Sequence, residues 1–150
     1  MTKAPLIRIA PERKTQLEEL AAAFGTKSMS ATIGELMRIA REAGEIKHAI
    51  PGVRINKLQD GFTISFDDST PVGFTVDQMK SLVGLIHLVV YNNDQTGRVA
   101  DRAKKFTVTR QGAAFKVAIP ADGIVKIWTA DIALDFADLM ESEISDATPA

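Results

Sequence analysis

The chain has 150 residues, of which 45% are hydrophobic and 25% charged, enough for one ordinary domain or two small ones. It contains no cysteine, which excludes disulfides, thiol catalysis and zinc sites built on thiolates. The net charge is −1, but residues 1–44 hold seven Lys or Arg and five Asp or Glu. That segment therefore carries +2 and the other 106 residues −3, which suits a DNA-contacting segment attached to an acidic body.

The sequence predicts a soluble, cytoplasmic protein without a membrane span. The longest apolar run, 85–91, is interrupted by His87 and is far shorter than the roughly 18 residues of a spanning helix. The first residues lead into a strand-like run and lack the apolar centre of a signal peptide. The absence of cysteine fits a reducing compartment.

Residues 1–44 are predicted to form a strand and two helices. Leu6–Ile9 is short and rich in β-branched residues, which predicts a strand, and Pro11 is typical of the first position of a helix. Gly25 is suited to the C-terminal end of that helix, and Ser28 is suited to the start of the next one. Both helices show the i, i+3, i+4, i+7 spacing of one apolar face, made of Leu17, Leu20, Ala21 and Phe24 in the first and of Ile33, Leu36, Met37 and Ala40 in the second.

This pattern resembles the ribbon-helix-helix DNA-binding family over about 40 residues. The resemblance implies an obligate dimer in which two N-terminal strands pair into an antiparallel ribbon that enters the major groove of DNA. It also implies that the start of the second helix holds a phosphate. Two such dimers side by side on double-stranded DNA are then expected.

Strand parity assigns the candidate DNA-contacting residues. Ile7 and Ile9 should share the inner face with Pro5, and Leu6 and Arg8 should point toward DNA. Arg8 is the candidate for a base contact and Leu6 for a thymine methyl group. The phosphate contacts would come from Lys3, Lys27, Ser28 and Ser30. Simpler interpretations stay open: a solvated strand charge for Arg8, a purely protein-facing role for Leu6, and plain helix capping for the residues at the start of the second helix.

The rest of the chain is predicted to be a linker, 45–52, and an α+β body, 53–142, with a frayed tail at 143–150. Two similar segments, about 53–91 and 106–142, each predict a β-β-(β)-α unit. Thr75 and Gln78 have the spacing of a capping box before the first helix. Two interpretations stay open: a true duplication that builds one antiparallel sheet with two helices on one face, or two common hairpin–helix segments.

Other chemistry is not indicated. Two histidines, His48 and His87, without cysteine predict no metal site and no cofactor. Asp131, Asp135 and Asp138 share one helical stripe that is most simply the solvent side, and no phosphate loop or nucleophile motif is present, so we expect no enzyme.

The favoured function is therefore a dimeric, sequence-specific DNA-binding protein, such as a transcriptional repressor or a plasmid or phage accessory factor. Its body would add oligomerisation or bind a partner or ligand. The alternative is a protein–protein interaction or inhibitor module whose N-terminal ribbon only dimerises.

Overall fold

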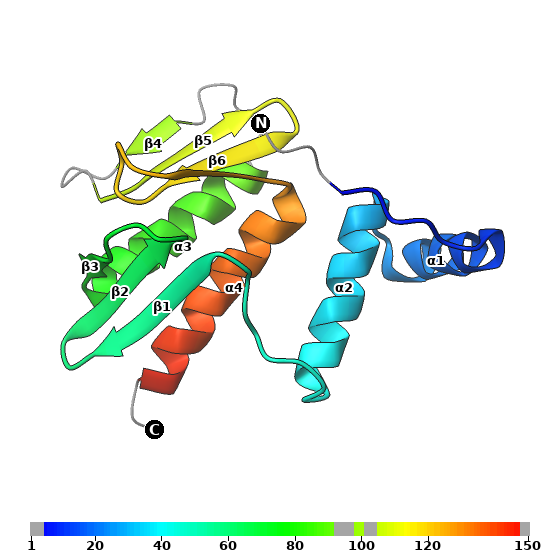
Figure 1. Cartoon of the computed structure of the whole chain (residues 1–150), viewed down its shortest axis with the longest axis horizontal. Coiled ribbons are helices and arrows are strands. Elements are labelled where there is room, and N and C mark those ends of the chain that lie inside the picture. Colours follow the sequence, from blue (N-terminus) through cyan, green and yellow to red (C-terminus); the bar gives the residue numbers. More distant parts are fainter. Residues whose placement is uncertain (1–4, 92–97, 101–104, 148–150) are drawn as a thin grey trace. The chain divides into compact units, whose positions relative to one another are not determined.

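The structure is a computed structural model that describes residues 5–91, 98–100 and 105–147 (Figure 1). The chain divides into two compact units, Met1–Ile46 and Lys47–Ala150, called here the N-terminal unit and the C-terminal unit. Helices and antiparallel strands both occur, in agreement with the predicted α+β class. Among the described residues, no helix is long and apolar enough to cross a membrane.

Two helices make up most of the N-terminal unit. Helix α1 (Pro11–Phe24) begins at the proline and ends at Gly25, whose φ of 70° is the left-handed conformation that glycine adopts without strain. Helix α2 (Met29–Glu42) begins after Ser28, whose hydroxyl accepts a hydrogen bond from the backbone N–H of Ala31 at 3.0 Å. The predicted helix ends are thus confirmed.

A buried threonine fixes the turn between the two helices. The Thr32 hydroxyl lies 2.6 Å from the Thr26 hydroxyl and donates to the Ser28 carbonyl at 3.0 Å. Thr32 is the only buried residue among residues 5–46. The N-terminal unit therefore orders its turn with polar contacts and encloses no apolar core in the single chain.

The predicted strand Leu6–Ile9 is not formed in the single chain. Residues 5–10 belong to no helix or strand, although Ala10 has the extended angles φ −62° and ψ 146°. A strand needs a neighbour for its backbone N–H and C=O groups, and no described strand pairs with this segment. The prediction of a strand here depends on a partner.

The C-terminal unit contains two antiparallel sheets and two helices. The first sheet has the order β1-β2-β3 and the second the order β4-β5-β6-β7. The strands are β1 (Val53–Leu58), β2 (Gly61–Phe66), β3 (Val72–Phe74), β4 (Arg98–Ala100), β5 (Thr107–Gln111), β6 (Ala114–Ala118) and β7 (Val125–Trp128), and the helices are α3 (Val76–Tyr91) and α4 (Ala130–Ala147). The order β-β-β-α thus occurs twice, with β4 as an added strand that the sequence did not predict.

The prediction of one continuous antiparallel sheet is wrong. No ladder joins the described strands of the two sheets, and side chains connect them instead. The ammonium group of Lys105 donates to the Gly73 carbonyl at 2.7 Å, and that of Lys126 donates to the Asp67 carboxylate at 2.7 Å. These side-chain contacts link the two sheets without extending either one.

One apolar core fills the C-terminal unit. Helix α3 begins with the predicted capping box, in which the Thr75 N–H donates to the Gln78 side chain at 2.9 Å and the Gln78 N–H donates to the Thr75 hydroxyl at 3.1 Å. Aromatic rings from both sheets meet helix α4, with the Phe66 ring 5.6 Å from Trp128 and 5.9 Å from Phe136. Both β-β-β-α segments therefore build the same core.

The predicted linker and tail both belong partly to this core. Ile50 is buried, and His48 Nε2 lies 3.2 Å from Asp135 Oδ1 on α4, so part of the segment 45–52 is packed rather than free. Helix α4 continues to Ala147, and Ile144 packs against the core, which corrects the frayed tail predicted from residue 143. Residues 148–150 lie outside the described part of the chain.

Candidate nucleic-acid interface

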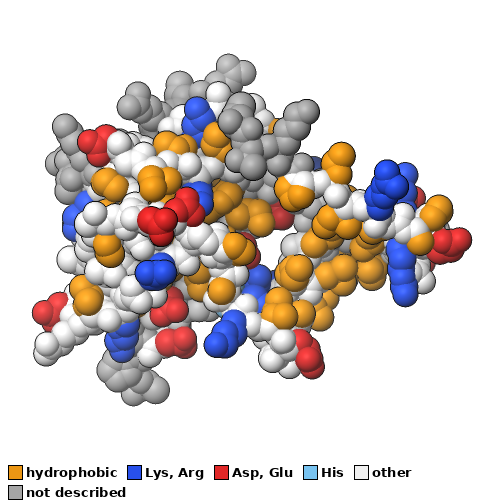
Figure 2. Space-filling model, in the orientation of Figure 1, with side chains coloured by type: hydrophobic (Ala, Val, Ile, Leu, Met, Phe, Trp, Pro, Cys, Tyr) orange, Lys and Arg blue, Asp and Glu red, His pale blue; other side chains and the backbone are white. Residues whose placement is uncertain are grey.

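An open apolar surface covers the two helices of the N-terminal unit. Figure 2 shows hydrophobic side chains gathered over α1 and α2. Ile33 is 42% exposed and Met37 is 49% exposed, although helical spacing places both on the predicted inner face of α2. Leu17 and Phe24 of α1 are only half-buried. The side chains predicted to form a core are therefore present on one surface but lack a cover.

The segment before α1 adds to this surface. Leu6 is 98% exposed and Ile7 is 82% exposed, whereas Ile9 is 47% exposed. Apolar side chains this accessible are costly in water when they are contiguous, and contiguous apolar patches commonly mark interaction sites. Apolar side chains on a segment outside any helix or strand thus lie exposed within the described part of the chain.

Two of the predicted cationic residues are available for an anionic ligand. Arg8 and Lys27 are exposed, and no ion pair or hydrogen bond engages either side chain within the described residues. Lys3, the third predicted cation, lies outside the described residues. The structure places Arg8 before α1 and Lys27 in the turn before α2, so it leaves both charges free for contacts beyond the chain.

The predicted serines serve local structure. Ser28 caps α2 through its hydroxyl, and its carbonyl accepts from both the N–H and the hydroxyl of Thr32. Ser30 lies in the first turn of the helix and is exposed. The first amides of a helix precede its hydrogen-bond ladder, so the start of α2 presents backbone donors next to Lys27.

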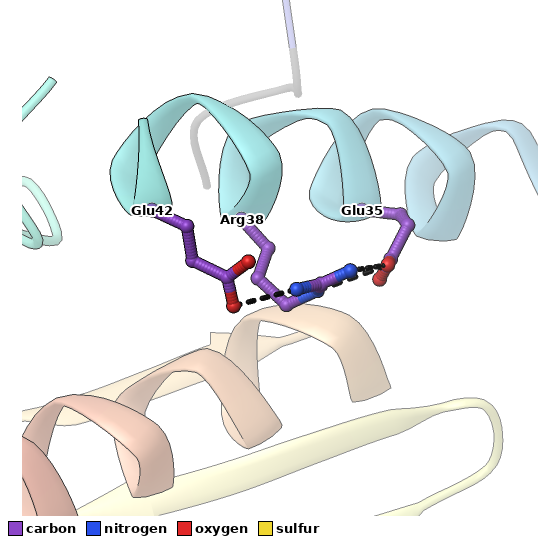
Figure 3. A network of polar contacts seen from close by, with 3 residues as sticks. All are labelled: Glu35, Arg38 and Glu42. Carbon is purple, nitrogen blue, oxygen red and sulfur yellow. Dashed lines mark hydrogen bonds and ion pairs between the residues drawn. The ribbon is translucent and has the colours of Figure 1, made fainter. Parts of the chain in front are cut away.

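One of the two arginines of α2 is paired within its own helix. Arg38 lies between two glutamates, as Figure 3 shows. Its guanidinium donates to Glu35 at 2.9 Å from Nε and to Glu42 at 2.6 Å from Nη1. The hydrogen bond from Arg38 lowers the pKa of Glu35, and both glutamates raise the pKa of Arg38. Arg38 is thereby neutralised by adjacent carboxylates and is a poor candidate for a phosphate contact.

The candidate metal and acid–base groups do not gather into a site. Among the described residues, no group of three or more His, Asp and Glu side chains could hold a metal ion. The predicted solvent stripe of α4 is wrong at Asp135, which is half-buried and paired with His48. His87 is half-buried and meets the ring of Tyr91 edge-on at 5.9 Å.

Two features of this surface were not predicted from the sequence. The hydrogen bond between the Thr26 and Thr32 hydroxyls joins residues six apart, a spacing that no helix or strand period indicates. The Glu35–Arg38–Glu42 network, in contrast, follows the i+3 and i+4 spacings and was detectable in the sequence.

Comparison of the chain with protein-family models, with curated proteins and with solved structures gave no match.

Proposed function

We propose that the N-terminal unit pairs with the same unit of a second copy and that the resulting dimer binds double-stranded DNA. The observation that carries this proposal is the missing core. Among residues 5–46 no apolar side chain is buried, yet both helices carry apolar faces at regular spacing. Neither helix is long enough to be stable in water without packing, so a second copy supplies the missing cover.

The same pairing gives residues 5–10 a partner. Two antiparallel copies of this segment satisfy each other's backbone groups and place Ile7 and Ile9 over the helices. Leu6 and Arg8 then face outward, on the side of the ribbon that enters a major groove. Within the described residues no hydrogen bond or ion pair engages the Arg8 side chain, which supports its role as the base or phosphate contact.

The start of α2 provides the second contact. Its backbone donors, the positive end of its dipole and the exposed Lys27 together favour an anion. Ser28 keeps its capping bond in this arrangement, so its role is to hold the helix start in place. Ser30 lies two residues after Ser28, in the first turn of α2, and would contact the same phosphate.

A second function is favoured by the apolar outward residues. Leu6 is almost fully exposed and has no group that could form a hydrogen bond to a base. In the C-terminal unit, β7 carries Val125, 47% exposed, and Ile127, 56% exposed. Exposed apolar side chains on an edge strand favour a protein partner. In this alternative the N-terminal units only dimerise, and the protein is an interaction or inhibitor module.

The test is binding to random-sequence duplex DNA at two salt concentrations, with the molar mass measured by light scattering. The variant Arg8→Ala removes the proposed contact, and Arg54→Ala, an exposed arginine on β1, is the matched control. We expect a dimer whose affinity falls steeply with salt, and Arg8→Ala should reduce the salt dependence by about one unit of slope per copy. A dimer that binds no DNA at low salt would contradict the DNA-binding function and favour the alternative.

A further inference from the structure

The sulfur atoms of this chain are all thioethers. The sequence holds five methionines and no cysteine, so a response to an oxidant through sulfur must come from methionine. Met79 and Met140 have 0% of their surface exposed and lie in the core of the C-terminal unit. Met29 at the start of α2 is half-buried, whereas Met37 in the same helix is 49% exposed. Met37 is therefore the most accessible methionine among the described residues.

Met37 belongs to the apolar face that is proposed to pair. It lies four residues after Ile33 and three before Ala40, so the three side chains share one side of α2. In the single chain about half of Met37 is open to solvent, and in the proposed dimer a second copy covers it. The accessibility of this side chain to a small oxidant therefore depends on pairing.

Hydrogen peroxide reacts with a thioether by oxygen transfer. A lone pair of the sulfur attacks one oxygen, the O–O bond breaks as the S–O bond forms, and the transferred oxygen gives its proton to the departing hydroxide. The sulfur is oxidised by two electrons, and the peroxide is reduced to water. The product, methionine sulfoxide, is polar, and methionine sulfoxide reductases return it to the thioether. The modification is therefore covalent but reversible.

We propose, on the basis of the pairing proposed above, that oxidation of Met37 to its sulfoxide by hydrogen peroxide dissociates the paired N-terminal units. The S=O group loses its water when a second copy covers it, and Ile33 and Ala40 beside it carry no hydrogen-bonding side chain. A polar group buried without a partner weakens the contact by about tenfold in each copy. Oxidation of both copies should therefore raise the dissociation constant of the dimer about 100-fold.

Pairing and oxidation of Met37 then oppose each other. A second copy shields the side chain from peroxide, and a sulfoxide formed on a dissociated copy hinders its return to the dimer. A modification that favours the single chain shifts the equilibrium toward it by mass action. The dimer is thus controlled both by peroxide and by the concentration of the chain.

Treatment of the full chain with hydrogen peroxide tests this control. Mass spectrometry of peptides locates the added oxygen, and light scattering measures the molar mass before Met79 and Met140 are oxidised. We expect Met37 to be oxidised first, and more slowly at protein concentrations at which the dimer forms. The molar mass should fall from that of a dimer to that of a single chain, and methionine sulfoxide reductases should restore the dimer.

Two leucine variants provide the controls. Met37→Leu keeps an apolar side chain of similar volume without sulfur, so it should remain a dimer and lose its sensitivity to peroxide. Met29→Leu removes the other methionine of α2 and should stay sensitive.

A dimer that persists when Met37 is fully oxidised, or a Met37→Leu dimer that peroxide still dissociates, would overturn the proposal and leave the N-terminal pairing standing. An untreated chain that is a monomer at every concentration would refute the pairing and this proposal with it. The same holds for a Met37 that is oxidised equally fast in monomer and dimer, because the dimer would then not cover this face.

Discussion

Truncation of Met37 should weaken the dimer. Burial of a whole methionine side chain is worth about 1.5–3 kcal/mol, and 49% of Met37 is still exposed before pairing. Burial of the exposed half of Met37 therefore contributes about 1 kcal/mol of pairing free energy from each copy, and about 2 kcal/mol from both. Met37→Ala should raise the dissociation constant of the dimer about 30-fold.

Sedimentation equilibrium over a range of protein concentrations measures this constant directly. Leu58→Ala is the control, because Leu58 is also 49% exposed but lies on β1 of the C-terminal unit. Alanine favours a helix as well as methionine does, so helix propensity does not produce the expected effect. Equal dissociation constants for Met37→Ala, Leu58→Ala and the unaltered chain would refute the reasoning.

Two further predictions concern the interior of each unit. Gly61→Ala should destabilise the C-terminal unit in thermal unfolding, because the added Cβ would collide with the backbone carbonyl of Phe74. Gly73→Ala on the neighbouring strand should have little effect, since its Cβ would meet nothing within 4 Å. Glu35→Gln should destabilise α2 at neutral pH, because the ionised carboxylate bonds to Arg38. Since the folded pKa of Glu35 is lowered, this stabilisation should be lost as the pH falls below the ordinary value of 4.5.

The controls define how each of these predictions fails. Equal melting temperatures for the two glycine variants would show that the approach of Gly61 to the next strand is not as close as described. The Glu35 contribution should be small and should decrease with added salt, because the pair is partly exposed. The helix contents of the unaltered chain and of Glu35→Gln should become more alike as the pH falls. A difference in helix content that grows as the pH falls would contradict the direction of the pKa shift.

Local signals made most elements predictable from the sequence. The capping residues Ser28 and Thr75 and the terminating Gly25 act within a few residues, and each begins or ends a helix where expected. Strands β1 and β3 both lie within the first predicted β-β-(β)-α segment, since alternation and turn residues are also local. What was predicted correctly thus depends on neighbours in the sequence.

Long-range packing was beyond reach of the same patterns. The attachment of His48 to Asp135 spans 87 residues, and the sequence pattern of a linker gives no sign of it. The strands divide into two sheets, and the contacts of Lys105 with Gly73 and of Lys126 with Asp67 join residues far apart in the sequence, which no strand period reveals. The polar residues around Ile144 predict a tail, but the Ile144 side chain packs against the core.

The candidate interface was predictable in part for a related reason. The apolar faces of α1 and α2 are visible in the sequence, but a face that awaits a second copy has the same spacing as one that packs within the chain. Leu6–Ile9 likewise has strand-forming residues without the partner that a strand requires. The exposure of Ile33 and Met37 is what distinguishes the two cases.

Hydrogen exchange of the backbone amides of residues 6–9 tests the central claim most directly. A paired ribbon protects the amides of this segment that donate hydrogen bonds to the partner strand. Their protection should rise with protein concentration as the measured mass approaches that of a dimer. The protection should be lower in Met37→Ala. Amides that exchange at the rate of an unstructured chain at concentrations where the mass is that of a dimer would contradict the paired ribbon and, with it, the proposed DNA contact.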